Sequence, residues 1–174
     1  MSTRKPTKPI VSILKKLSQH QGKTMLARLG DGKPFLTLVA TILSARVRDE
    51  VTETVVPEVM RRWPDAESLA RARPGQVEKV IKRIGLYRVK SVRLVEVAKK
   101  IVEDFGGQVP QELDDLVKLP GVGRKTAGCV VVYAFGGDAL PVDTHVHRIS
   151  NRLGWVDTKT PEKTEQALLQ IVPR

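Results

Sequence analysis

Apolar residues recur at helical spacing along most of this chain, and that spacing limits the possible folds more than any other feature. Stripes with intervals of three or four residues run through segments 10–17, 51–60, 77–84 and 94–102, and such intervals place apolar side chains on one face of a helix. Segment 35–45 is apolar on nearly all sides, which predicts a buried central helix. Segment 129–133 favours a strand by propensity, but no partner strand is visible, so we predict a helix there.

Glycine and proline clusters divide these helical segments. They fall at 30–34, 73–75, 106–107, 120–123 and 136–137, and such clusters mark turns. Asp65 precedes one segment and is predicted to be an N-cap. The chain is therefore predicted to be all-α, with about nine or ten short helices. Its 174 residues suffice for one domain, or for one domain with a small satellite.

The charge is strongly positive. The chain has 30 Lys and Arg against 19 Asp and Glu, for a net charge of +11, and seven of the basic residues precede the first acidic residue, Asp31. Such an excess attracts polyanions, of which nucleic acid is the commonest; a solvated basic surface is the alternative. The sequence lacks an apolar run long enough to span a membrane and begins without a segment of signal-peptide type, so we expect a cytoplasmic, nucleoid-associated protein.

The sequence contains one cysteine, Cys129. A single thiol excludes an intramolecular disulfide and any four-cysteine metal or iron–sulfur site made by this chain alone. Cys129 lies in an apolar run, so we expect it to be a small core residue.

Segment 116–127 carries the most informative motif. A short helix with Leu113 and Leu116 leads into Pro-Gly-Val-Gly at 120–123, and a second helix follows. The two glycines permit a tight turn with outward-pointing N–H groups, next to the free N–H groups and positive dipole end of the second helix. That arrangement binds a phosphate without reading a base, although a plain helix–helix connection explains most such turns.

Two charged residues near this turn are candidates for catalysis. Lys125 lies in the first turn of the second helix, where the dipole and partial burial are expected to favour the neutral amine, which can attack a sugar carbon and form a Schiff base. Asp143 is predicted to cap the helix that begins at Thr144, and its fixed carboxylate can stabilise positive charge on a sugar ring. The alternatives are a solvated or phosphate-binding lysine and an aspartate that only caps. His145 and His147 point to different sides of a helix, so we expect no shared metal ion and a hydrogen-bonded, structural role.

Together these motifs resemble a known family. Leu-Pro-Gly-Val-Gly-Arg-Lys-Thr-Ala at 119–127, followed by Val-Asp-Thr-His at 142–145, is similar to the signature of the endonuclease III family of DNA glycosylases. The likeness also includes 42–45, 84–87 and 106–110 and covers residues 10 to 174. It implies the helix-hairpin-helix DNA glycosylase fold, with residues 28–136 in one helical lobe and residues 1–27 plus 137–174 in the other. Lys125 and Asp143 would then face each other across the cleft between the lobes.

The resemblance also implies an activity. It is that of a bifunctional DNA glycosylase and AP lyase, which excises oxidised pyrimidines from duplex DNA in base excision repair and cleaves the strand by β-elimination. Lys125 would be the nucleophile and Asp143 the catalytic aspartate, and the residues expected to contact DNA are Arg46, Leu86, Gly121, Gly123 and Arg124. Leu86 would act as an apolar wedge that replaces the flipped base; ordinary core or turn packing is the alternative.

Arg46 departs from the family pattern, because the family's second gap-filling residue is usually a glutamine at this position. An arginine could still fill the gap, and could hydrogen-bond the base left without a partner or a phosphate. This change leaves open a second substrate class, uracil or thymine paired with guanine. A non-catalytic helix-hairpin-helix DNA-binding module is a third interpretation. Nearby Asp49 is expected to offset the charges of Arg46 and Arg48.

The expected cofactors and partners follow from the same resemblance. Family members continue into a loop whose four cysteines bind a [4Fe-4S] cluster, whereas this sequence stops at Arg174 without them, as a cluster-free branch or a truncated product. We therefore expect no cluster ligands in this chain. Backbone carbonyls of Val117, Leu119 and Val122 are candidates to hold a monovalent cation at the hairpin. The expected partner is double-stranded DNA containing damaged bases or abasic sites, bound by a monomer without membrane contact.

Overall fold

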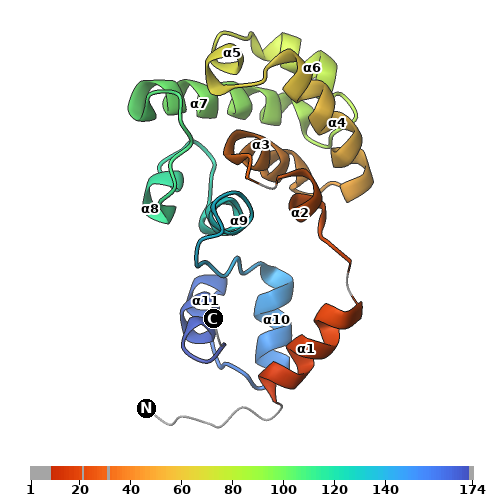
Figure 1. The fold of residues 1–174 in the computed structure, drawn as a ribbon, viewed down its shortest axis with the longest axis vertical. Coiled ribbons are helices and arrows are strands. Elements are labelled where there is room, and N and C mark those ends of the chain that lie inside the picture. Colours follow the sequence, from red (N-terminus) through yellow and green to blue (C-terminus); the bar gives the residue numbers. More distant parts are fainter. Residues whose placement is uncertain (1–8, 21, 31, 173–174) are drawn as a thin grey trace.

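The computed structural model describes residues 9–20, 22–30 and 32–172, and every regular element in these ranges is a helix. The first six helices are α1 (Ile10–His20), α2 (Met25–Leu29), α3 (Pro34–Ser44), α4 (Asp49–Arg62), α5 (Ala66–Ala70) and α6 (Pro74–Ile81). The other five are α7 (Tyr87–Phe105), α8 (Leu113–Leu116), α9 (Arg124–Phe135), α10 (Thr144–Arg152) and α11 (Pro161–Leu169). The all-α prediction is confirmed (Figure 1). Arg4, Lys5, Lys8 and Asp31, on which part of the charge argument depends, lie outside the described residues.

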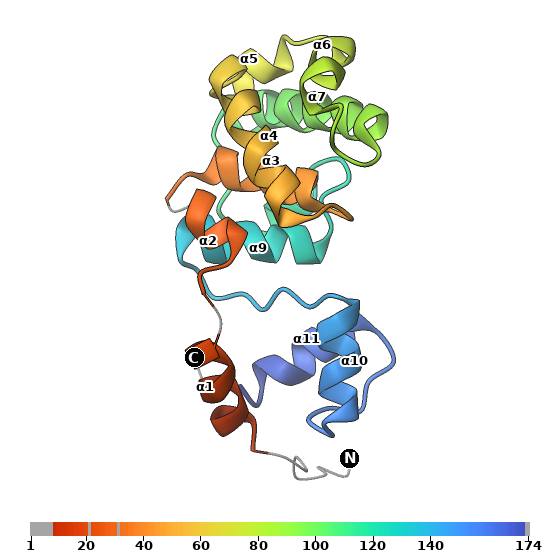
Figure 2. The same cartoon turned by 90° about the vertical axis from the view of Figure 1, so that its right-hand side faces the viewer.

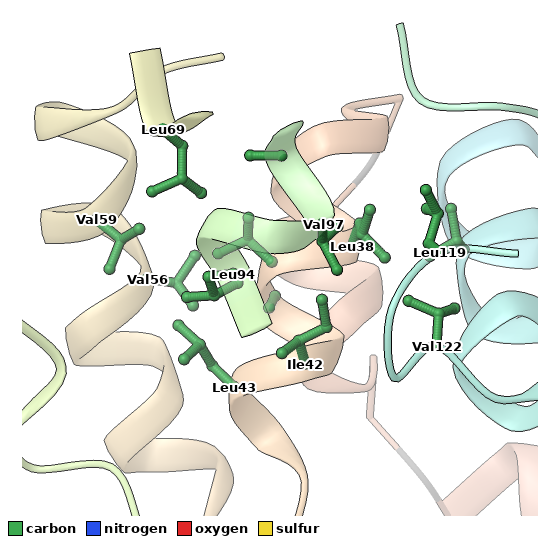
Figure 3. Packing of buried hydrophobic residues seen from close by; sticks show 14 of the residues in the cluster. Leu38, Ile42, Leu43, Val56, Val59, Leu69, Leu94, Val97, Leu119 and Val122 are labelled. Atoms are coloured by element: carbon green, nitrogen blue, oxygen red, sulfur yellow. The ribbon is translucent and has the colours of Figure 1, made fainter. Parts of the chain in front are cut away.

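The centre of the larger group of helices is α3, as predicted for segment 35–45. Every residue from Thr37 to Leu43 is buried, and α3 packs against α2, α4, α7 and α9. Figure 3 shows Leu38, Ile42 and Leu43 of α3 among the side chains of α4 and α7, with Leu119 and Val122 of the hairpin on the far side from α4. Because a fully buried leucine stabilises a fold by roughly 1.5–3 kcal/mol, this helix anchors the elements that surround it.

Two local predictions are confirmed. Segment 129–133 lies within α9, where packing against α3 outweighs the strand propensity of its valines. The Asp65 carboxylate caps α5 by accepting a hydrogen bond of 2.8 Å from the Ser68 N–H.

The predicted number of helices is slightly low, since the described residues form eleven. Three of these helices are very short: α2 and α5 have five residues each, and α8 has four. A helix of that length contains little more than one turn, so its sequence cannot display a repeated apolar stripe.

The first apolar stripe, in segment 10–17, forms the predicted helix α1, but its apolar face is less buried than the spacing suggests. In α1 only Ile10 is buried, whereas Leu14 and Leu17 are 37% and 50% exposed. Amphipathic spacing therefore predicted the helix correctly and overestimated its packing, because spacing says nothing about what lies opposite a face.

The helices form two groups. In Figures 1 and 2, α1, α10 and α11 lie together, while α2 to α9 form the larger group, and extended segments connect the two. This grouping supports the division of the chain at residues 28–136, which we retain as a proposal. Met25 and Leu26 also belong to the larger group's core. Among the described residues, none of the helices combines the length and the apolar character needed to cross a bilayer.

Candidate active site

Buried apolar side chains anchor the turn between α8 and α9 to the core. Leu116, Leu119 and Val122 are 0%, 2% and 4% exposed, so they fasten the turn to the core, while Gly121 and Gly123 are exposed above them. Gly121 has φ = 68°, a conformation that favours glycine. Gly123 has an ordinary extended conformation and is the N-cap of α9.

An arginine from α7 lies over this turn. A Cβ atom added to Gly121 would stand 2.2 Å from Nε of Arg93, so the Arg93 side chain passes directly across the glycine. Sequence reasoning did not identify Arg93, because 28 residues separate it from the turn and it belongs to no recognisable motif. Its position adds a guanidinium group to the predicted phosphate-binding surface.

Lys125 lies in the first turn of α9, as predicted, but it is exposed. The expectation of partial burial is therefore wrong, since the buried part of α9 begins at Ala127. Lys125 lines an open pocket with a volume of about 290 Å³. The other lining residues belong to α2 and its N-cap, to α3, α4 and α9, and to the segment that precedes α10, and they are Thr24, Met25, Leu26, Ser44, Asp49, Cys129, Tyr133 and Pro141.

Asp143 caps α10, which confirms the local prediction. One carboxylate oxygen accepts hydrogen bonds from the N–H groups of His145 and Val146, at 2.9 and 2.8 Å. The segment that leads to Asp143 passes close to α9 at Gly128, where an added Cβ would stand 3.3 Å from Cγ of Pro141. The small residue at position 128 thus lets the Asp143 segment approach the helix that carries Lys125.

Cys129 connects the two charged candidates. It is buried, it lines the same pocket, and it lies one helical turn after Lys125. Burial raises the pKa of its thiol; the nearby Lys125 ammonium opposes this rise, and the Asp143 carboxylate adds to it. Because both charges act on one thiol, the fold brings Lys125 and Asp143 into the same region. The four-residue interval from Lys125 was the available sequence signal for a pocket position.

The two expected intercalating residues share an unusual backbone conformation. Arg46 and Leu86 are the described non-glycine residues with positive φ, at 59° and 60°. Both are exposed, Leu86 by 60%, so Leu86 is not an ordinary core residue. A Cβ atom added to Gly85 would lie 3.8 Å from the carbonyl oxygen of Arg46, which shows that the two loops pack side by side.

Arg124 makes a contact that the motif did not indicate. Its Nε and Nη2 atoms donate to the two carboxylate oxygens of Glu165 in α11, at 3.2 and 2.9 Å. The Glu165 side chain is only 9% exposed, and the pairing raises the pKa of the arginine. This ion pair joins α9 to α11, whereas a DNA contact by Arg124 stays a prediction.

The histidines of α10 and the hairpin carbonyls were the other sites considered. His147 Nδ1 is hydrogen-bonded to the Thr164 hydroxyl at 2.6 Å, which agrees with the structural role expected for it. Within the described ranges, His, Cys, Asp and Glu form no group of three or more that could hold a metal ion. At the hairpin, the Leu119 carbonyl accepts from the Val122 N–H, and the monovalent cation stays a prediction.

Comparison with known proteins gives a consistent result. Residues 39–174 match the model of the HhH-GPD superfamily, described as base excision DNA repair protein. The chain is 51% identical over 140 residues to the endonuclease III of Thermotoga maritima, and the match covers 80% of this chain and 66% of that protein. It is 42% identical over 166 residues to the endonuclease III of Synechocystis, with coverages of 95% and 74%.

The fold is also similar to a solved complex. The structure of a trapped endonuclease III–DNA covalent intermediate, in an estranged-adenine complex, superposes with a TM-score of 0.85 at 33% identity. The match covers 99% of this chain and 80% of that one. The chain thus spans about two thirds to four fifths of the length of these relatives.

Proposed function

Because the chain belongs to the HhH-GPD superfamily of base excision DNA repair proteins, we propose that it is a DNA glycosylase with AP lyase activity. One observation carries the proposal: Lys125 lines an open pocket, next to the glycine turn and close to the thiol on which Asp143 also acts. A primary amine, a carboxylate and room for a nucleotide are what the reaction needs.

The chemistry assigned to Lys125 proceeds in two stages. Its neutral amine attacks C1′ of the damaged nucleotide, and the C1′–N bond breaks as the base leaves with its electron pair and takes up a proton. The resulting carbinolamine-like adduct opens the sugar ring to form a Schiff base. Loss of a proton from C2′ then expels the 3′-phosphate, which is the β-elimination step of an AP lyase.

Asp143 supports both stages. One of its carboxylate oxygens accepts hydrogen bonds from two backbone N–H groups, which fix the position of the side chain. A fixed negative charge stabilises the positive charge that develops on the sugar ring as the base departs, and it can accept or return protons.

Duplex DNA is the proposed partner. The hairpin glycines and Arg93 offer one strand a phosphate site. Arg46 and Leu86, which are exposed on adjacent loops, would fill the space left by the extruded base. We propose oxidised pyrimidines as the substrate class. Uracil or thymine opposite guanine is the second candidate, because Arg46 is exposed on one of those loops and an arginine can hydrogen-bond the base left without a partner.

A [4Fe-4S] cluster is implied by the family and needs four thiolate ligands. The sequence has a single cysteine, and Cys129 is buried at the pocket. These residues do not fit such a cluster, and no step of the proposed reaction passes through one.

Borohydride trapping on abasic-site DNA tests the proposal. The wild-type protein should form a covalent adduct that Lys125→Ala abolishes, while Lys99→Ala, which changes an exposed lysine of α7, should trap normally. Duplex binding without an adduct in the wild type would indicate a binding module instead. An adduct undiminished in Lys125→Ala would assign the nucleophile to another amine.

A panel of duplexes distinguishes the substrate classes. We expect faster single-turnover excision of thymine glycol and dihydrouracil than of uracil or thymine opposite guanine. The reverse order would favour the mismatch glycosylase.

A further inference from the structure

Lys90 is a buried lysine that the proposed chemistry does not use. It lies one turn into α7 and is 4% exposed. Its ammonium donates hydrogen bonds of 2.8 and 2.7 Å to the carbonyl oxygens of Leu43 and Ala45. Burial, together with the charge of Arg93, lowers the pKa of this ammonium to about 8. Burying a cation is costly, so its retention here needs a reason.

The two carbonyls belong to the end of α3. The last carbonyls of a helix lack hydrogen-bond donors within the helix and carry the negative end of its dipole. An ammonium group supplies the missing donors and a favourable positive charge. Ala45 immediately precedes Arg46, the residue with left-handed backbone. The Lys90 hydrogen bond to the Ala45 carbonyl therefore lies directly next to the left-handed residue.

The same lysine is tied to the second loop through its backbone. The Lys90 N–H donates to the Leu86 carbonyl at 3.0 Å, and Leu86 is the left-handed N-cap of α7. Left-handed backbone at a non-glycine residue is strained and persists only where surrounding contacts determine it. Lys90 therefore contacts the residue just before Arg46 with its side chain and Leu86 itself with its main chain.

Resting on the glycosylase function proposed above, we infer that Lys90 is a positioning residue that locks the Arg46 and Leu86 loops together as one rigid intercalating unit. Without its ammonium, the end of α3 would lose two hydrogen bonds and the Arg46 loop would move independently of the Leu86 loop. A displacement of about 1 Å at such a site can cost on the order of a hundredfold in rate, even though Lys90 itself touches no DNA.

Fluorescence of 2-aminopurine tests this inference without requiring chemistry. The probe is placed opposite a tetrahydrofuran abasic analogue in duplex DNA, where insertion of the wedge unstacks it. Lys90→Met keeps the length of the side chain and removes the donors, and it should reduce the fluorescence increase at saturating protein. Lys99→Met, an exposed control on the same helix, should behave as the wild type. Lys90→Gln, which retains two N–H donors, is made in parallel and should lie between.

Two further readouts separate positioning from a general loss of structure. Lys90→Met should slow single-turnover excision from duplex DNA by roughly tenfold to a hundredfold, while adduct formation on single-stranded abasic DNA, which needs no wedge, changes little. In a Leu86→Ala background, Lys90→Met should have little additional effect, because non-additivity is expected of residues that act through one another.

Contrary results are equally clear. Unchanged fluorescence in both Lys90 variants, an equal loss on duplex and single-stranded DNA, or an undiminished Lys90→Met effect in the Leu86→Ala background would each overturn the inference. Failure of the wild-type protein to form any adduct would instead contradict the proposed function, and the fluorescence comparison would still test Lys90.

Discussion

At the scale of single residues, the candidate site combines a capping aspartate with an exposed lysine. One carboxylate oxygen of Asp143 accepts hydrogen bonds from the first turn of α10, which fixes the position of this side chain before any substrate binds. Lys125 lines an open pocket, and its side chain interacts with the Cys129 thiol there. The capping role and the catalytic role of Asp143 can therefore be separated by substitution.

We expect Asp143→Asn to slow base excision by roughly 10²–10⁴-fold with little change in stability, because asparagine is also a good N-cap. Asp143→Ala should lose the activity and also about 1 kcal/mol of unfolding free energy. Single-turnover kinetics and urea denaturation measure the two effects. Normal turnover in Asp143→Asn would limit this residue to capping.

Lys90 predicts a particular pH dependence of stability. Its pKa is about 8 in the folded protein, against an ordinary value of 10.5, so between these values the unfolded chain binds a proton that the folded chain does not. Stability then rises with pH across this window, because the penalty for burying the ammonium, present below pH 8, is relieved.

The wild type should consequently gain unfolding free energy relative to Lys90→Met between about pH 8 and pH 10.5. Urea titrations of both proteins at several pH values measure this difference, in which the titration of all other groups cancels. A difference that stays constant would show that Lys90 keeps its ordinary pKa.

At the scale of elements, the two glycines of the hairpin, Gly121 and Gly123, occupy their positions for different physical reasons. Gly121 has positive φ and lies beneath Arg93, whereas Gly123 has ordinary φ and open space around the position of its Cβ. The fold of the free protein therefore requires glycine only at position 121. Glycine at position 123 is a favoured N-cap residue, and we propose that the open space above it also admits a DNA phosphate.

We expect Gly121→Ala to cost roughly 1–2 kcal/mol of stability from left-handed strain, in addition to displacing Arg93. Gly123→Ala should cost only about 0.5 kcal/mol as an N-cap change, yet still weaken duplex binding clearly. Thermal denaturation and fluorescence anisotropy with labelled duplex measure the two properties. Full DNA affinity in Gly123→Ala would remove the phosphate from this turn.

At the scale of the whole molecule, the Arg124–Glu165 pair ties α9, which carries Lys125, to α11 in the other group of helices. Arg124→Gln leaves a nearly buried carboxylate without its partner, so it should cost about 1–3 kcal/mol. Glu165→Gln leaves only a half-exposed arginine and should cost less. Urea denaturation gives both values, and equal costs would contradict the bracing role.

The same variants show whether Arg124 also binds DNA. A phosphate contact would lower the slope of log K against log salt by about 1 in Arg124→Gln. We expect this change, because the motif predicts a DNA contact by Arg124. An unchanged slope would show that the guanidinium, already paired with Glu165, makes no phosphate contact.

The sequence alone determined the parts of this protein that depend on neighbouring residues. Helical spacing predicted α3, α4, α6 and α7, and the local motifs predicted the hairpin and the Asp65 and Asp143 caps, because caps and periodicity are short-range effects. The tertiary structure alone decided which distant residues meet. Arg93 over Gly121, Lys90 at the end of α3, Arg124 on Glu165 and the exposure of α1 all depend on how helices pack, and packing joins residues that no local pattern relates.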